Sequence, residues 1–137
     1  MPSGLRTVTT GDGSVTVFSD EFGQTMHSSS GAYDEALRKH VIPSRLTDHF
    51  SGPVRVLDVG FGLGYNILAL LNTFRLGKIP SRIEIISLEK DRSAEDTLYS
   101  INFGDERDVI FQNIRKAFHD GSFKWDNISL TVIFGDA

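Results

Sequence analysis

Three glycines follow an acidic residue at regular spacing near the middle of the chain. Asp58 stands close to the end of an apolar run, and Gly60, Gly62 and Gly64 come after it at alternate positions. This G-x-G-x-G spacing differs from the G-x-G-x-x-G of dinucleotide sites, where the third glycine allows close helix packing beside a pyrophosphate. The spacing therefore favours a cofactor without a phosphate group.

S-adenosylmethionine is a cofactor of that kind. Its methionine end offers a carboxylate to the amides at a helix start and an ammonium group to an acidic side chain. Asp58 fits the second role, directly or through water, and Gly60 and Gly62 would let the ribose and the methionyl carbons approach the backbone. We therefore predict that Asp58, Gly60, Gly62 and Gly64 bind S-adenosylmethionine.

Two further acidic residues end later apolar runs. Glu89 lies roughly 25 residues beyond the glycines, close to the offset of a ribose-binding acid, and Asp136 ends the last run, where it would accept from the adenine amino group. Such glycines often only make a turn, and Glu89 beside Lys90 also fits a solvated loop. The order and spacing of the glycines and the three acidic residues together favour a cofactor site, because the carboxyl ends of parallel strands meet at one edge of a sheet.

The elements that must position these residues alternate between strand and helix. The pattern predicts an N-terminal β-hairpin and a helix, and then strands that pair in parallel through right-handed crossovers, so that the fold class is α/β with a Rossmann-like sheet. The expected ranges are strands 6–10 and 14–18, a helix over 31–41 that ends before Pro43, strand 53–60, helix 65–76, strand 82–89, helices 93–101 and 107–118, and strand 128–134.

The chain divides into an N-terminal extension over residues 1–50 and the N-terminal half of a Rossmann-like domain over 51–137. Only three parallel strands are expected, whereas doubly wound sheets usually have more. The sequence therefore predicts a sheet truncated after its third parallel strand. We expect the uncovered edge of strand 53–60 to favour self-association, and we expect no catalysis by this polypeptide alone.

Composition narrows the class of protein. The chain has 137 residues, 39% of them hydrophobic, which fits one globular domain, and it has no cysteine, which excludes disulfides, thiolate zinc sites and cysteine nucleophiles. The net charge of −4 does not indicate a nucleic-acid surface. Without a leader or a long apolar run, a cytoplasmic location is expected, with no membrane contact and no metal.

Several segments together resemble the MnmC-type tRNA methyltransferases, which finish 5-methylaminomethyl-2-thiouridine at the wobble position. They are residues 10–19, 22–28, 31–36 and 58–66. The last segment follows the family's Gly-Phe-Gly-Thr-Gly-Leu-Asn pattern, with Leu63 in place of threonine. This resemblance adds Phe61 and Asn66 to the predicted cofactor residues.

The resemblance implies a class I methyltransferase fold, S-adenosylmethionine as the methyl donor, and tRNA as the substrate, methylated on the aminomethyl nitrogen. A primary ammonium group must lose its proton before methylation, and no residue is identified as the base. Glu35, on the first helix, could face the mouth of the pocket, but an exposed helical carboxylate is favoured. His40 fits a cation at a helix end. Two alternatives stay open: a fragment of an NAD-binding dehydrogenase, disfavoured by the glycine spacing, and a binding or regulatory domain without catalysis.

Overall fold

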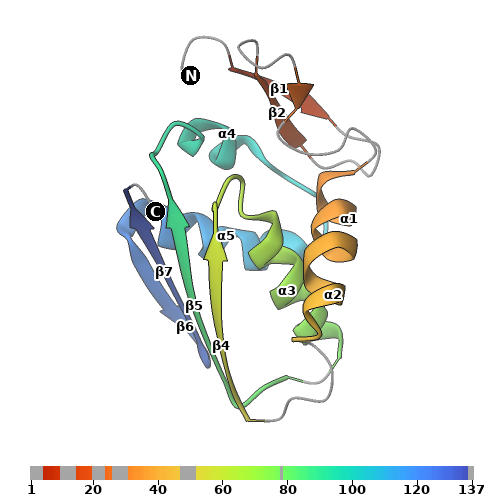
Figure 1. Cartoon of the computed structure of the whole chain (residues 1–137), viewed down its shortest axis with the longest axis vertical. Helices are drawn as coiled ribbons and strands as arrows, with labels where there is room; N and C mark the ends of the chain where they lie inside the picture. Colours follow the sequence, from red (N-terminus) through yellow and green to blue (C-terminus); the bar gives the residue numbers. More distant parts are fainter. Residues whose placement is uncertain are drawn as a thin grey trace.

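The computed structural model describes residues 5–9, 15–19, 24–25, 31–46, 52–77 and 79–135. Within them, a small antiparallel sheet has the order β1 (Leu5–Thr9), β2 (Val15–Ser19) and β3 (Gln24–Thr25). A larger sheet has the order β4 (Pro53–Val59), β5 (Arg82–Glu89), β7 (Ile128–Phe134) and β6 (Ser122–Trp125). Figure 1 shows the helices packed on one side of the larger sheet.

Parallel pairing joins β4 to β5 and β5 to β7, which confirms the predicted α/β class with its Rossmann-like sheet. The N-terminal hairpin is also present, shifted by one residue from the expected ranges. The prediction missed β6, which pairs antiparallel with β7 through the turn at Asp126 and Asn127. The signal was there, because Ser122 to Trp125 alternates polar and aromatic residues before two turn-forming residues.

Helices follow the expected positions with one correction. They are α1 (Ala32–Ala36), the π-helix η1 (Leu37–Val41), α2 (Ile42–Ser44), α3 (Tyr65–Leu76), α4 (Glu95–Ser100) and α5 (Arg107–Asp120). The expectation that the first helical segment ends before Pro43 is wrong. The backbone stays helical from Val41 through Pro43 to Ser44, with Val41 at φ −70° and ψ −55° and Ile42 at φ −61° and ψ −49°, and Arg45 ends it with a φ of 60°.

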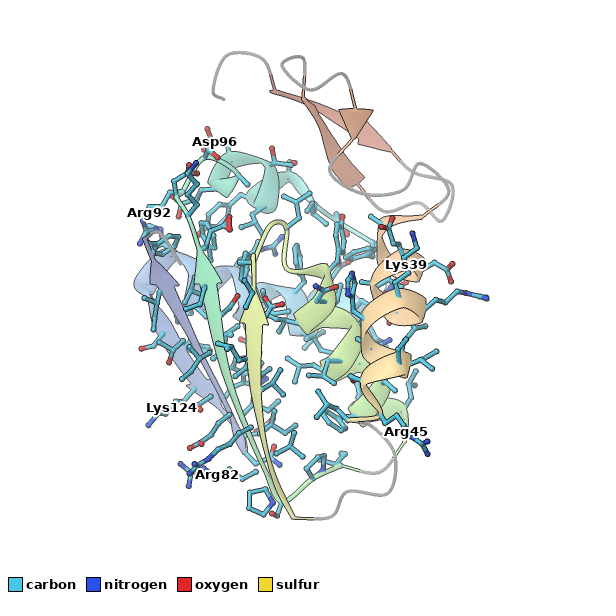
Figure 2. The ribbon with its side chains drawn as sticks, in the orientation of Figure 1. Lys39, Arg45, Arg82, Arg92, Asp96 and Lys124 are labelled. Atoms are coloured by element: carbon cyan, nitrogen blue, oxygen red, sulfur yellow. The ribbon has the colours of Figure 1, made fainter. Side chains whose placement is uncertain are left out.

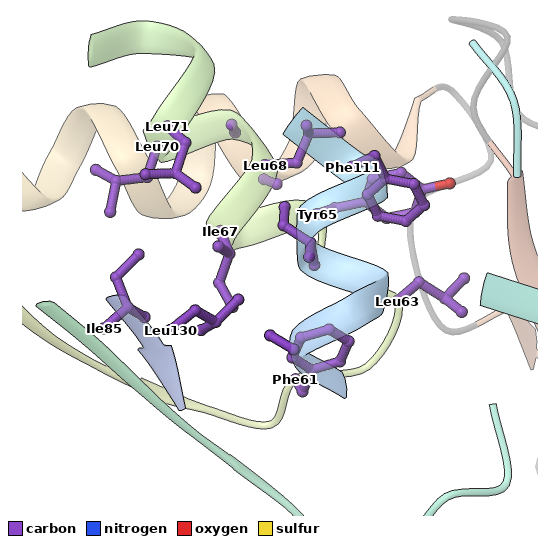
Figure 3. Close-up of a cluster of buried hydrophobic side chains, with 14 of the residues drawn as sticks. Phe61, Leu63, Tyr65, Ile67, Leu68, Leu70, Leu71, Ile85, Phe111 and Leu130 are labelled. Carbon is purple, nitrogen blue, oxygen red and sulfur yellow. The ribbon is translucent and has the colours of Figure 1, made fainter. Parts of the chain in front are cut away.

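The core lies between the larger sheet and α3 and α5. Because β4, β5 and β7 follow one another in the same direction across the sheet, right-handed crossovers place their connecting helices on the same face. On that face Ile85 and Leu130 belong to one buried cluster with apolar side chains of α3 and α5, and Figure 3 shows Ile67 of α3 beside them. This packing holds β4, α3 and β5 as one rigid unit.

The opposite face of the larger sheet carries exposed apolar side chains. Leu57 and Val59 of β4 are 65% and 66% exposed, and Ile133 of β7 is 50% exposed. Among the strands that the structure describes, β4 pairs with β5 alone, so its outer edge is uncovered there, as the sequence predicts. The self-association expected from that edge stays a prediction.

Charged side chains lie at both ends of the larger sheet. Figure 2 shows Arg82 and Lys124 at one end and Arg92 and Asp96 at the other. The second end is the one at which β4 and β5 finish and the glycine turn begins, so it is where the predicted cofactor residues come together.

Candidate functional site

The backbone of the turn after β4 favours glycine at its alternate positions. Gly60, Gly62 and Gly64 have φ values of 84°, 58° and 77°, in the left-handed region that side chains disfavour. The amides of Gly60 and Phe61 donate to the carbonyl of Leu88 at 2.9 and 3.1 Å. The turn is therefore anchored on the end of β5, directly before Glu89.

Two of these glycines have different surroundings. A Cβ atom at Gly64 would lie 3.1 Å from Ile114 Cγ2 and 3.1 Å from Phe61 Cζ, so Gly64 allows close packing of the turn on α5. A Cβ atom at Gly60 would meet no other atom within 4 Å. Gly60 therefore borders open space, as expected of a backbone that a ligand approaches, whereas Gly64 serves the fold.

Phe61 belongs to the core. Its side chain is 3% exposed and its ring lies 4.9 Å from that of Phe118, centroid to centroid. Figure 3 shows it beneath the turn, among the buried side chains. Any contribution of Phe61 to cofactor binding thus depends on its backbone and on the shape it gives the turn.

Asp58 is held by groups from two other elements. The Ser87 hydroxyl on β5 donates to Asp58 Oδ2 at 2.7 Å, and the Asn66 side chain on α3 also hydrogen-bonds to this carboxylate. Burial raises the pKa of Asp58, while these two bonds and the charge of His40 oppose that rise. The carboxylate is therefore fixed in place, and the cost of burying its charge is only partly offset by these groups. A cationic ligand group beside it would be favourable.

Glu89 lies against the glycine turn. The amide of Gly62 donates to Glu89 Oε2 at 3.4 Å, a long contact that leaves the carboxylate capacity for other donors. Burial raises the pKa of Glu89, the Gly62 bond opposes this, and the charges of Asp91 and Asp58 raise it further. A neutral donor such as a hydroxyl group can hydrogen-bond to this carboxylate without adding further charge to the site.

Two neighbouring cavities adjoin these residues. The glycine-turn cavity, of about 210 Å³, is lined by Glu35, Ala36, His40, Gly60, Phe61, Gly62, Tyr65 and Asn66. The β4-edge cavity, of about 350 Å³, is lined by His40, Val41, Ser44, Leu46, Val56, Leu57, Asp58, Val59, Asn66, Ile67, Leu70 and Ile85. His40 and Asn66 line both, so the two cavities meet at these side chains.

The structure thus brings together the predicted residues Asp58, Gly60, Gly62, Asn66 and Glu89. Asp136, the predicted adenine ligand, lies outside the described residues. The strand that precedes it ends at the site, because the amide of Gly135 donates to the carbonyl of Glu89 at 2.9 Å.

Three functional candidates were missed or misjudged from the sequence. Ser87 could have been found by aligning β4 with β5, since it pairs in register with Asp58. For Glu35 the sequence favoured an exposed helical carboxylate over a place at the mouth of the pocket, but its side chain is only 20% exposed and lines the glycine-turn cavity, with Lys39 Nζ at 3.7 Å. His40 borders both cavities because of the π turn in η1, which no sequence pattern indicated.

In the part of the chain that the structure describes, no group of three or more histidine, aspartate and glutamate side chains is placed to hold a metal ion. No helix within the described ranges is long and apolar enough to cross a membrane.

Comparison with known proteins gives several likenesses, although no protein-family model matches the sequence. The crystal structure of MnmC2 from Aquifex aeolicus superposes with a TM-score of 0.78 and 31% identity, over 99% of this chain and 44% of that one. The chain is MnmC-like. A 28% identity, over 89% of this chain, relates it to the tRNA 5-methylaminomethyl-2-thiouridine biosynthesis bifunctional protein MnmC of Polaromonas.

The third likeness is to an uncharacterized protein of Methanocaldococcus jannaschii, at 33% identity over 95% of this chain. This MnmC-like chain spans 35% of the archaeal protein and 21% of the Polaromonas protein. The likeness to MnmC2 covers nearly the whole chain, so it includes the glycine turn and the ends of β4 and β5.

Proposed function

We propose that this chain binds S-adenosylmethionine at the glycine turn and forms the cofactor-binding part of an MnmC-like tRNA methyltransferase. The observation that carries the proposal is the juxtaposition of the open backbone at Gly60 with two fixed carboxylates, those of Asp58 and Glu89. The likeness to MnmC2 supports a methyltransferase, and the name of the Polaromonas relative supports tRNA modification.

The cofactor's parts fit the residues present. Glu89 would accept hydrogen bonds from the ribose hydroxyls, and Asp58, held by Ser87 and Asn66, would attract the ammonium group, directly or through water. Gly60 would let the ligand lie against the backbone. The three lie on the carboxyl-terminal side of the parallel strands, where ligands of such sheets bind.

When bound, the cofactor supplies a methyl group on a positively charged sulfur, which a neutral amine can attack. The contribution of this chain is orientation: anchoring both ends of the ligand fixes the direction of the methyl group, and such positioning is worth on the order of 7 kcal/mol or more of the barrier. We propose the aminomethyl nitrogen of the modified wobble uridine as the acceptor, by likeness to the MnmC proteins.

Isothermal titration with S-adenosylhomocysteine and, separately, with NAD tests the cofactor. We expect S-adenosylhomocysteine to bind and NAD not to bind, because the glycine turn lacks the spacing that serves a pyrophosphate. Binding of NAD alone would contradict the proposal and favour a dehydrogenase relative.

Transfer of labelled methyl to tRNA bearing the aminomethyl uridine tests the reaction. The assay compares this chain with a longer polypeptide that completes the sheet, because no catalysis is expected of this chain alone. We expect transfer by the longer polypeptide only. Binding of S-adenosylhomocysteine without transfer by either would favour the second candidate, a nucleotide-binding domain without catalysis.

A further inference from the structure

His40 occupies an unusual stretch of helix at the junction of the two cavities. It lies in η1, a π-helical turn, and such turns occur frequently at functional sites because the extra residue displaces a side chain from its regular position. His40 lines both the glycine-turn cavity and the β4-edge cavity. Its charge also acts on the Asp58 carboxylate, lowering the pKa of that group against the effect of burial.

The other basic residues of this turn are engaged elsewhere. Arg38 Nε lies 2.8 Å from Asp34 Oδ1 and its side chain is 74% exposed, whereas Lys39 is paired with Glu35 and is 67% exposed. Neither lines the glycine-turn cavity or the β4-edge cavity, so His40 is the basic residue among those that line the glycine-turn cavity. Glu35 is the acidic one, and the Asp58 carboxylate hydrogen-bonds to Asn66, which lines the same cavity.

A cavity with one histidine and one carboxylate side chain matches a ligand group that has both a carboxylate and an ammonium group. The amino-acid end of S-adenosylmethionine has a carboxylate and an ammonium group on the same carbon. A histidine N–H donates well to a carboxylate, and the bond is stronger when the imidazole is charged. The start of α3, at Tyr65 in the same cavity, also favours negative charge through the helix dipole.

We propose that His40 binds the carboxylate of the amino-acid end of the cofactor, and that Glu35 and Asp58 share its ammonium group. This inference rests on the proposed function, since it assigns one end of the same ligand. It gives the N-terminal helical segment a role in ligand recognition, in addition to packing on α3.

Three probes separate this contact from the rest of the site. S-adenosylhomocysteine has the complete amino-acid end. Its decarboxylated analogue, the 3-aminopropyl thioether of adenosine, keeps the ammonium group without the carboxylate. Methylthioadenosine lacks both charges but keeps the ribose and adenine.

Affinities of the three probes are measured by titration calorimetry for the unchanged chain and for His40→Ala. We expect His40→Ala to weaken S-adenosylhomocysteine binding about tenfold or more, the loss typical of a hydrogen bond to a charged group. The affinities for the two probes without a carboxylate should change by less than about twofold.

Arg38→Ala is the matched control, because it removes a positive charge from the same turn without touching either cavity. His40→Gln, which keeps a side-chain N–H donor, serves if His40→Ala alters the circular dichroism spectrum, and it should lose less affinity than His40→Ala. Equal loss for all three probes, or no loss for S-adenosylhomocysteine, would overturn the assignment of His40. If S-adenosylhomocysteine does not bind the unchanged chain at all, the proposed function itself fails.

Discussion

Replacing Gly64 and Gly60 in turn with alanine separates the structural use of the glycine turn from its use in binding. At Gly64 the new Cβ would lie 3.1 Å from both Ile114 Cγ2 and Phe61 Cζ, at a φ of +77°. The left-handed backbone costs about 1–2 kcal/mol for alanine, and overpacking a core adds about 1–3 kcal/mol. Gly64→Ala should therefore lower the free energy of unfolding by about 2–5 kcal/mol.

Gly60→Ala should lower the free energy of unfolding less than Gly64→Ala does, but it should weaken ligand binding. The φ there is +84°, yet no atom lies within 4 Å of the new Cβ, so only the backbone cost of about 1–2 kcal/mol applies. The new methyl group would occupy the space that we assign to the ligand. Gly60→Ala should thus bind S-adenosylhomocysteine more weakly than the unchanged chain while remaining folded.

Urea unfolding followed by far-ultraviolet circular dichroism measures the stability of both variants, and titration calorimetry measures their affinity. Equal destabilisation by the two substitutions would refute the packing role of Gly64. Unchanged affinity in a folded Gly60→Ala chain would refute the ligand's approach to this backbone.

Three further predictions concern the carboxylates. Glu89→Ala should weaken S-adenosylhomocysteine binding by about 1–3 kcal/mol, or about 5- to 150-fold in titration calorimetry, and unchanged affinity would remove Glu89 from the site. Ser87→Ala should lower the free energy of urea unfolding by about 1–3 kcal/mol, because Asp58 Oδ2 loses its buried donor; no loss of stability would contradict the importance of that bond. The stability of Glu89→Gln relative to the unchanged chain should increase as pH rises. Burial raises the pKa of Glu89 above its ordinary 4.5, so the folded chain holds this proton more tightly than the unfolded chain and loses stability when the proton leaves. Urea unfolding at a series of pH values from below 4.5 to neutral checks this sign, and a difference that does not vary with pH would contradict it.

Local patterns were sufficient to predict the elements that carry the site. The β-branched run before Asp58 and the apolar spacing over 65–76 predicted β4 and α3 with the correct bounds, apart from one residue at the end of β4. Glycine at alternate positions predicted the turn, since only a left-handed backbone requires that residue type so regularly. Once these elements were predicted, parallel topology implied that the carboxyl ends of the strands lie together.

The features of the site that the sequence did not predict depend on tertiary contacts. The exposure of Glu35 was misjudged because helical periodicity does not reveal that the start of α3 and the glycine turn lie against its face of α1. The position of His40 depends on a π turn, whose one-residue offset has no simple sequence signal. Pro43 predicted a helix end, although the helical backbone continues from η1 through it to Ser44.

The most direct test of the account is an amide chemical-shift titration of the isotopically labelled chain with S-adenosylhomocysteine. The account predicts saturable shifts at Gly60, Gly62 and Glu89 with a single affinity. Asn127, which lines a separate cavity of about 270 Å³ near the β6–β7 turn, should not move. Shifts concentrated around Asn127, or none at Gly60 and Gly62 under saturating ligand, would contradict the claim that the glycine turn and Glu89 form the cofactor site.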